Sequence, residues 1–407
     1  MITTWKQTND AGITYPEGFV AAGVRCGLKT IGDDLALIVC DTVATAAGVF
    51  TTNRVQAACV KYSKRVARNG SARAILINAG NANACNGEQG DIDNRRMAEW
   101  ASRLLNTPYD SVLVASTGVI GHPMPMDKLS TGIGLAVSAL DRNPPTDQKV
   151  SEAIMTTDTR PKRIAVECDS EHWSAPIRFG GMCKGAGMIA PNMATMLGFI
   201  TTDVRIKPEL LQEALTKAVA DSFNSVTVDG DTSTNDMCLV LASGMGGTEI
   251  SSRGPEYLDF VDALTRVGVA LAKEIARDGE GATKLAEITV VGATARSAAH
   301  QIARTIAESP LVKTALFGND PNWGRIMMAA GRSGVPFDPD HVDVQIGDHS
   351  VFHQGTSVEF DRIAAHEYLK SSEVTIIVDL NMGDENATVW TCDYSYDYIK
   401  INAEYHT

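Results

Sequence analysis

The chain has 407 residues, of which 44% are hydrophobic and 21% are charged, a composition typical of a globular protein that can bury a large core. A chain of this length usually forms roughly two to three domains. The formal net charge of −13 argues against nucleic acid or an anionic membrane as a partner, since both bind basic surfaces. An anionic substrate would therefore need a local cluster of positive charge.

The sequence predicts a cytoplasmic protein. No apolar stretch reaches the ~18 residues of a membrane-spanning helix. The first 23 residues lack the basic region and apolar core of a signal peptide. Eight cysteines occur without a C-x-x-C pair, so we expect free thiols in a reducing compartment, and neither a zinc ribbon nor a redox pair.

The predicted elements indicate a mixed α/β protein. Short β-rich apolar runs at 72–80 and 111–117 predict two strands. Apolar residues spaced four apart predict a helix over 208–224, with Pro208 in its first turn. A second helical pattern covers 257–279.

The pattern changes after about residue 285. The sequence then predicts a helix near 297–308, followed by alternating strands around 341–352, 374–380 and 387–401. We therefore predict a core domain over 1–284 and a smaller, β-rich C-terminal α/β domain over 285–407.

Six segments are small, polar and rich in glycine, and several of them directly follow an apolar run. They are NAGNANACNGEQG (78–90), STGVIG (116–121), KGAGMIAPNMATMLGFITTD (184–203), TVDGDTSTND (227–236), RDGEGATK (277–284) and FGNDPNWGR (317–325). Any one of them fits a surface turn. Together they favour functional loops at strand ends, where a rigid scaffold positions reactive groups.

The segment 184–203 fits none of the common catalytic motifs. A phosphate-binding loop has its lysine after the glycines, whereas Lys184 precedes them. The chain has no G-x-S-x-G or H-E-x-x-H motif, and its eight histidines show no metal-ligand spacing. Asp229, Asp231 and Asp236 are suited to a divalent cation but lack the complete calcium-loop pattern, so we predict no metal site.

Thr195 is surrounded by Met193, Met196 and Leu197 and raises the question of threonine chemistry. Threonine is a poor nucleophile without an adjacent base, and an N-terminal threonine has that base in its own α-amine, which titrates near pH 8. Breaking the bond after Ala194, by an N-to-O acyl shift and ester hydrolysis, would produce it. From the residues alone, self-cleavage and a buried structural threonine both remain open.

The Gly-rich segment around Thr195 closely resembles the self-processing segment of the ornithine acetyltransferase family of arginine biosynthesis. Further motifs follow in that family's order, from residue 18 to the last residue: GFVAAGVRCGLK, NAGNANACNG, STGVIG, SFNSVTVDGDTSTND, RDGEGATK, GNDPNWGRIMMAAGRSG and YIKINAEYHT. The resemblance implies a layered core of the self-processing N-terminal-nucleophile type. It also implies cleavage between Ala194 and Thr195 into an α chain (1–194) and a β chain (195–407), with two copies of each in a heterotetramer.

The resemblance also implies roles for individual residues. Thr195 matches the acetyl-accepting nucleophile, and Thr117 with Gly118 matches the pair that stabilises the oxyanion. Substrate contacts transfer to Thr157, Lys184, Thr195, Glu280, Asn402 and Thr407. The choice between Thr156 and Thr157 stays open, because the spacing around this short motif can differ among members.

The implied reaction is acetyl transfer from N2-acetyl-L-ornithine to L-glutamate through acetyl-Thr195, with no cofactor. Whether acetyl-CoA is a further acetyl donor is left open by the sequence. Two alternatives remain: an N-terminal-threonine amidase or aminopeptidase, which ends in hydrolysis, and an uncleaved protein whose Gly-rich loops bind a small anion.

Overall fold

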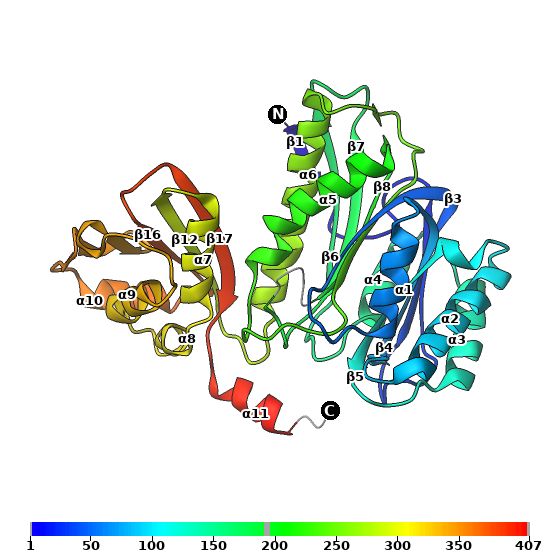
Figure 1. Cartoon of the computed structure of the whole chain (residues 1–407), viewed down its shortest axis with the longest axis horizontal. Coiled ribbons are helices and arrows are strands. Elements are labelled where there is room, and N and C mark those ends of the chain that lie inside the picture. The colour runs from blue at the N-terminus through cyan, green and yellow to red at the C-terminus, as the bar shows by residue number, and fades with distance from the viewer. Residues whose placement is uncertain (1, 191–195, 405–407) are drawn as a thin grey trace.

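The computed structural model describes residues 2–190 and 196–404 (Figure 1). The predicted bond between Ala194 and Thr195, and the predicted contact residue Thr407, lie outside the described residues. Within the described ranges, no helix has the length and apolar character needed to cross a bilayer.

A mixed sheet forms the centre of the larger part of the molecule (Figure 1). In the described residues it has nine strands. Eight follow one another in the order β1 (Ile2–Gln7), β6 (Lys162–Ser170), β7 (Ile177–Lys184), β8 (Leu197–Thr202), β10 (Met237–Ala242), β3 (Leu35–Phe50), β4 (Ser71–Asn81) and β5 (Val112–Val119), while β2 (Phe19–Val24) pairs with β3 off this path. The pairs β8–β10 and β4–β5 are parallel, and the others are antiparallel.

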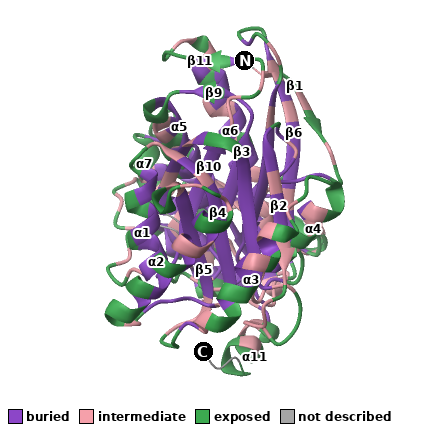
Figure 2. Ribbon diagram, turned by 90° about the vertical axis from the view of Figure 1, so that its right-hand side faces the viewer, coloured by how far each residue is buried: buried purple, intermediate pink, exposed green. Residues whose placement is uncertain are grey.

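Helices cover this sheet and bury its central strands. Strands β8 and β10 are buried along their whole length, which explains why β10, with the sequence MCLVLA, is a continuous apolar run rather than an alternating one. One apolar core joins the sheet to α1 (Ala58–Ala67), α2 (Gly87–Leu104), α3 (Met126–Ser138) and α4 (Pro144–Ala153). A second core joins it to α5 (Pro208–Ala220) and α6 (Pro255–Arg277). Figure 2 shows the buried strands inside and the exposed helix surfaces outside.

A second sheet forms the smaller part of the molecule. Its strand order is β15 (Thr356–Ser357), β14 (His349–His353), β13 (Asp343–Ile346), β16 (Glu373–Asp379), β12 (Leu285–Ala293) and β17 (Glu385–Cys392). It packs with α7 (Arg296–Ala307), α8 (Pro310–Phe317), α9 (Trp323–Gly331) and α10 (Arg362–Leu369), and the short strands β9 (Arg205–Ile206) and β11 (Glu249–Ile250) pair apart from both sheets.

The two sheets have separate cores, but the smaller part also contributes to the larger one. Leu285, Trp390 and Cys392 pack into the core that contains α5 and α6. The second sheet begins at Leu285, the first residue after the predicted domain division, and the division itself stays a prediction. The mixed α/β class and the layered core are confirmed.

Most predicted elements are present with small shifts at their ends. The strands expected at 72–80 and 111–117 are β4 and β5, and the helices expected at 208–224, 257–279 and 297–308 are α5, α6 and α7. The strand expected at 341–352 is a hairpin of β13 and β14, because Gly347 turns the chain with a φ of 56°. Helices α8, α9 and α10 were not predicted, and Asp361 caps α10 by accepting hydrogen bonds from the Ile363 and Ala364 N–H groups.

The strand predicted over 387–401 is wrong in its second half. Strand β17 ends at Cys392, and residues 396–404 form helix α11 (Tyr396–Glu404), in which no residue is buried. Asp393 leaves the strand to accept hydrogen bonds from the N–H groups of Thr283 and Lys284. The Ser395 hydroxyl oxygen then accepts from Asp397 N at 3.2 Å, as an N-cap residue does.

A buried ionic network ties the end of α6 to the start of β6. Lys162 Nζ lies 2.6 Å from Asp158 Oδ1 and also contacts the Asp278 carboxylate. The three side chains are 0%, 1% and 4% exposed, so solvent does not screen their charges. Burial raises the pKa of Asp158, but Lys162 and Lys184 outweigh that effect and hold it at about 2.

Lys162→Met should therefore lower the free energy of unfolding by about 3–5 kcal/mol at neutral pH, because it leaves two buried carboxylates without their cation. The depressed pKa of Asp158 stabilises the fold above the unfolded-state value of 3.8, and this contribution is lost as the pH falls toward about 2. In the variant the pKa of Asp158 rises, so acid unfolding should begin at a higher pH. Urea titrations monitored by circular dichroism between pH 2 and pH 7 measure both effects.

Lys217→Met is the matched control, since Lys217 pairs with Glu213 at 2.9 Å but the two side chains are 50% and 30% exposed. Its effect should stay below about 1 kcal/mol. If Lys162→Met and Lys217→Met lowered the free energy of unfolding equally, the buried network would have no special role in stability.

Candidate active site

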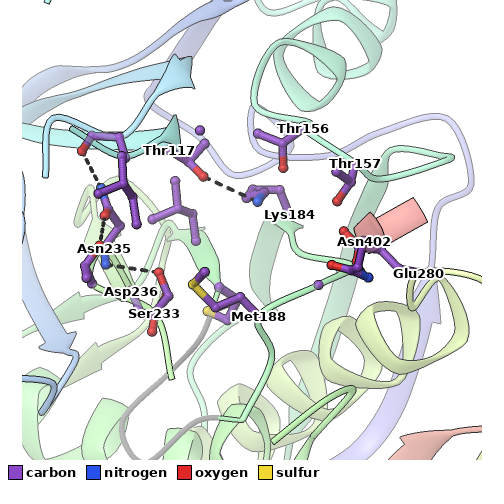
Figure 3. Close-up of a pocket in the computed structure, with 17 residues that line it drawn as sticks. Thr117, Thr156, Thr157, Lys184, Met188, Ser233, Asn235, Asp236, Glu280 and Asn402 are labelled. Atoms are coloured by element: carbon purple, nitrogen blue, oxygen red, sulfur yellow. Dashed lines mark hydrogen bonds between the residues drawn. The ribbon is translucent and has the colours of Figure 1, made fainter. Parts of the chain in front are cut away.

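A single pocket collects residues from segments that are far apart in the sequence (Figure 3). Its volume is about 190 Å³, below the ~300–1,000 Å³ of pockets for drug-sized ligands, which suits a small metabolite. It is lined by Ala82, Thr117, Gly118, Ile120, Thr156, Thr157, Lys184, Gly187, Met188, Met196, Leu197, Ser233, Thr234, Asn235, Asp236, Glu280 and Asn402.

Thr117 and Gly118 lie at the end of β5, where it runs parallel to β4. Gly118 has a φ of 129°, and a Cβ atom there would lie 2.3 Å from the carbonyl carbon of Gly80. Only glycine allows this approach of the two strand ends. The Asn235 amide joins the same ends, because its Nδ2 donates to Ala82 O at 2.6 Å and to Ser116 O at 2.8 Å.

Lys184 is the cation among the described residues that line the pocket. It ends β7, is 9% exposed, and its Nζ donates to Thr117 Oγ1 at 3.4 Å. Burial lowers the pKa of this ammonium, and the carboxylates of Asp158, Asp236 and Glu280 oppose that effect. The site therefore holds a poorly solvated positive charge beside a hydroxyl group at a strand end.

Asp158 holds two walls of the pocket in place. Its Oδ1 accepts from Gly185 N at 2.7 Å, and its Oδ2 accepts from Thr156 N at 3.0 Å. Both Thr156 and Thr157 line the pocket, so the choice between them as a substrate contact stays open.

Polar groups from the segment 227–232 fix the chain that leads toward the predicted cleavage bond. Asp229 accepts from Met188 N at 2.6 Å and from Ile189 N at 2.8 Å. Thr227 donates to Ile189 O at 3.0 Å, and Thr232 donates to Ala190 O at 2.9 Å. Every backbone group in these contacts lies within seven residues of the predicted bond.

Glu280 and Asn402 line the pocket on the side away from Thr117 (Figure 3). Asn402 Nδ2 donates to Glu280 Oε2 at 2.8 Å, and Glu280 N donates to Ala186 O at 2.8 Å. A Cβ atom at Gly187 would lie 2.4 Å from the Glu280 carboxylate, so glycine lets this carboxylate lie against the backbone.

The structure brings six of the predicted site residues to one pocket: Thr117, Gly118, Thr157, Lys184, Glu280 and Asn402. Ala194, Thr195 and Thr407 lie outside the described residues. The chemical roles of all nine stay predictions.

The sequence did not single out several other residues of this pocket. Ser233, Thr234 and Asn235 line it and were not singled out within their Gly-rich segment, and Asp236, considered only as a cation ligand, lines it too. Asp229, considered there as a cation ligand, instead binds backbone N–H groups. Among the described residues, no group of three His, Cys, Asp or Glu side chains is placed to hold a metal ion.

Comparisons with known proteins agree with the family resemblance. A family model described as the ArgJ family matches residues 20–407. The arginine biosynthesis bifunctional protein ArgJ of Symbiobacterium thermophilum is 49% identical over 97% of this chain and 98% of that protein. The protein of the same name from Synechococcus sp. is 48% identical over 100% of both chains.

A solved structure of such a relative is also similar. It is the crystal structure of the arginine biosynthesis bifunctional protein argJ from Bacillus halodurans, with a TM-score of 0.51 and 45% sequence identity. The match covers 52% of this chain and 100% of that chain. On the family model and the full-length relatives, this chain belongs to the ArgJ family.

Proposed function

We propose that this chain transfers an acetyl group from N2-acetyl-L-ornithine to L-glutamate in arginine biosynthesis, after cleaving itself between Ala194 and Thr195. The observation that carries the proposal is the pocket that combines Thr117, Gly118 and a buried Lys184 next to the segment leading to that bond. Membership of a family whose relatives are named arginine biosynthesis bifunctional proteins supports it.

The charges of the pocket complement those of N-acetylornithine. This substrate has one carboxylate and one side-chain ammonium, and the pocket has the Lys184 ammonium on one side and the Glu280 carboxylate on the other. Lys184 also supplies local attraction for an anion in a chain with a net charge of −13. Asn402 orients the Glu280 carboxylate by donating to it at 2.8 Å, and Thr157 and Thr407 complete the proposed contacts.

Two observations support cleavage. The segment 185–190 is held by side chains of Asp158, Asp229, Thr227 and Thr232. The match to the solved relative covers that chain's whole length and 52% of this chain. Residues 195–407 are 213 of the 407 residues, which is the same share. A processed β chain has that length.

The reaction proceeds in two half-reactions. The Thr195 hydroxyl attacks the acetyl carbonyl while its α-amine takes the hydroxyl proton. The Thr117 hydroxyl and the Gly118 N–H stabilise the oxyanion that develops. The C–N bond breaks, the proton passes to the leaving amine of ornithine, and glutamate's amine then attacks the acetyl-threonine ester by the reverse path.

Further parts of the proposal follow from the family. The relatives are called bifunctional, which supports acetyl-CoA as a second acetyl donor for glutamate. The reaction needs no cofactor. We place the enzyme in the cytoplasm, as a heterotetramer of two α and two β chains.

Incubation with N-acetylornithine, with and without glutamate, tests the function. A transferase should form N-acetylglutamate and ornithine in equal amounts and release little acetate, because the ester intermediate must be protected from water. An N-terminal-threonine amidase would release acetate at the same rate whether or not glutamate is present. A binding protein would do neither and would remain a single chain of 43.4 kDa.

Purified protein should show two bands of about half size on a denaturing gel, and one of them should begin Thr-Met-Leu-Gly. Thr195→Ala should remain a single full-length band, because the attacking hydroxyl is gone. Thr202→Ala is the matched control, since Thr202 is a fully buried threonine of β8, and it should cleave normally. Efficient cleavage of Thr195→Ala at the same bond would rule out the autocatalytic route.

Thr117→Ala should lower kcat about 10²-fold or more, because one of the two proposed donors to the oxyanion is lost. It should also slow self-cleavage, which passes through a similar tetrahedral oxyanion. Steady-state kinetics of the fully cleaved fraction measure the effect. A kcat within about twofold of wild type would refute the role of Thr117.

Thr156→Ala and Thr157→Ala are matched controls, because each removes a hydroxyl group from the same pocket. Neither should lower kcat as Thr117→Ala does. The variant with the larger increase in KM for N-acetylornithine identifies the substrate contact.

A further inference from the structure

The motif GFVAAGVRCGLK (18–29) has no part in the proposed reaction so far, yet it ends in a loop beside the pocket. The carboxylate of Asp34, which is fully buried, accepts hydrogen bonds from the N–H groups of residues 26–29 at 2.6 to 3.0 Å. The loop also packs on the end of β4, where a Cβ atom at Gly80 would lie 3.1 Å from Leu28 O. Charge-assisted hydrogen bonds to four successive N–H groups fix the backbone from which the last residue of the motif extends.

Lys29, that last residue, connects this loop to a wall of the pocket. Its side chain is half-buried, and its Nζ donates to Met155 O at 3.0 Å. Thr156, the next residue, lines the pocket, and so does Gly118, which lies against Gly80. Lys29 does not itself line the pocket, but its side chain runs from a loop beside one lining segment to another.

Lys29 places a second positive charge near Lys184. Burial lowers the pKa of Lys29, and the Lys184 ammonium lowers it further. Three carboxylates oppose this effect and favour the charged form: Asp34, Asp158 and Asp33. The hydrogen bond of Lys29 to a neutral carbonyl uses one of the three N–H donors of the ammonium group. The other donors are suited to an anion that enters the pocket.

The two substrates of the proposed reaction differ in the charge of their side chains. N-acetylornithine has an ammonium group, which suits Glu280, whereas L-glutamate has a second carboxylate, which Glu280 would repel. This carboxylate must therefore bind on the cationic side of the pocket. There, Lys184 faces the α-carboxylate of either substrate, and Lys162 is fully buried and already bound by two carboxylates. Lys29 is the further cation on this side.

We propose that Lys29 is a specificity-determining residue for the acetyl acceptor and binds the side-chain carboxylate of L-glutamate. This inference rests on the proposed function. The Lys29 ammonium turns from Met155 O to the carboxylate, while Asp34 keeps the loop in place. N-acetylornithine has no second carboxylate, so it leaves the bond to Met155 intact. One pocket can thereby accept, in turn, two substrates whose side chains have opposite charges.

The test uses the property that, in a ping-pong reaction, kcat/KM for each substrate reports on its own half-reaction. Lys29→Met keeps the length of the side chain and removes its charge. Its kcat/KM for glutamate should fall at least about tenfold, because a charge-assisted hydrogen bond is lost. Its kcat/KM for N-acetylornithine should stay within about twofold of wild type. Exchange of labelled ornithine into N-acetylornithine, which needs no glutamate, should also be unchanged.

L-Glutamine is the matched acceptor, because it has the length of glutamate and a neutral side chain. Wild type should prefer glutamate at least about tenfold in kcat/KM, and Lys29→Met should lose most of this preference. Lys29→Arg keeps the charge and should keep most of the preference. Lys128→Met is the control variant, because Lys128 is exposed, does not line the pocket, and donates to Gly27 O of the same loop at 2.7 Å. It should match wild type with every substrate.

The outcomes separate this inference from the proposed function. A wild type that acetylates glutamine as efficiently as glutamate overturns the role of Lys29 without any variant. Equal losses for N-acetylornithine and glutamate in Lys29→Met also overturn it, because the residue would then only hold the wall at Met155. Unchanged glutamate kinetics in Lys29→Met, with normal transfer by wild type, refute Lys29 alone. A wild type that forms no N-acetylglutamate overturns the proposed function and this inference with it.

Discussion

The buried ammonium of Lys184 is the charge on which the arrangement of the site depends. A buried cation is costly unless carboxylates and hydrogen-bond acceptors surround it. Asp158 lies behind it and Asp236 and Glu280 lie in the pocket. Asp158 is in turn held by Lys162, which also binds Asp278 at the end of α6. Opposite charges therefore alternate from the scaffold to the pocket, and each one favours the charged form of the next.

The sheet converts these local contacts into one site. Parallel pairing brings the ends of β4 and β5 to the same edge, and Gly80 and Gly118 allow them to approach closely. Asn235 then joins both ends to the start of β10. Reacting groups held by strand ends and side-chain amides keep their geometry without rearranging during the reaction, which is the condition for strong electrostatic stabilisation.

The sequence allowed the prediction of local features better than long-range ones. The Gly-rich ends of β4 and β5 were recognisable because glycine and an apolar run are adjacent in the chain. The role of Asn235 was not, since its partners Ala82 and Ser116 are 153 and 119 residues away. Asp236 looked like one of three possible cation ligands until the register of β8 and β10 placed it beside Met196. Ser395 is a residue type that often caps the start of a helix, and it could have indicated α11. The predicted strand was instead continued past Cys392, where β17 ends.

The order of strands in the large sheet determines what the proposed cleavage after Ala194 would do to the molecule. Strands β8 and β10 belong to the proposed β chain, and they lie between β7 and β3 of the α chain, with six residue pairs on each side. The two products are thus interleaved, and their separation would require breaking the sheet along two ladders at once. A β chain made alone would expose two long unpaired edges and would tend to aggregate. The proposed cleavage therefore requires the polypeptide to complete its fold as one chain first, and breaking the peptide bond afterwards would change its chemistry without dividing its architecture.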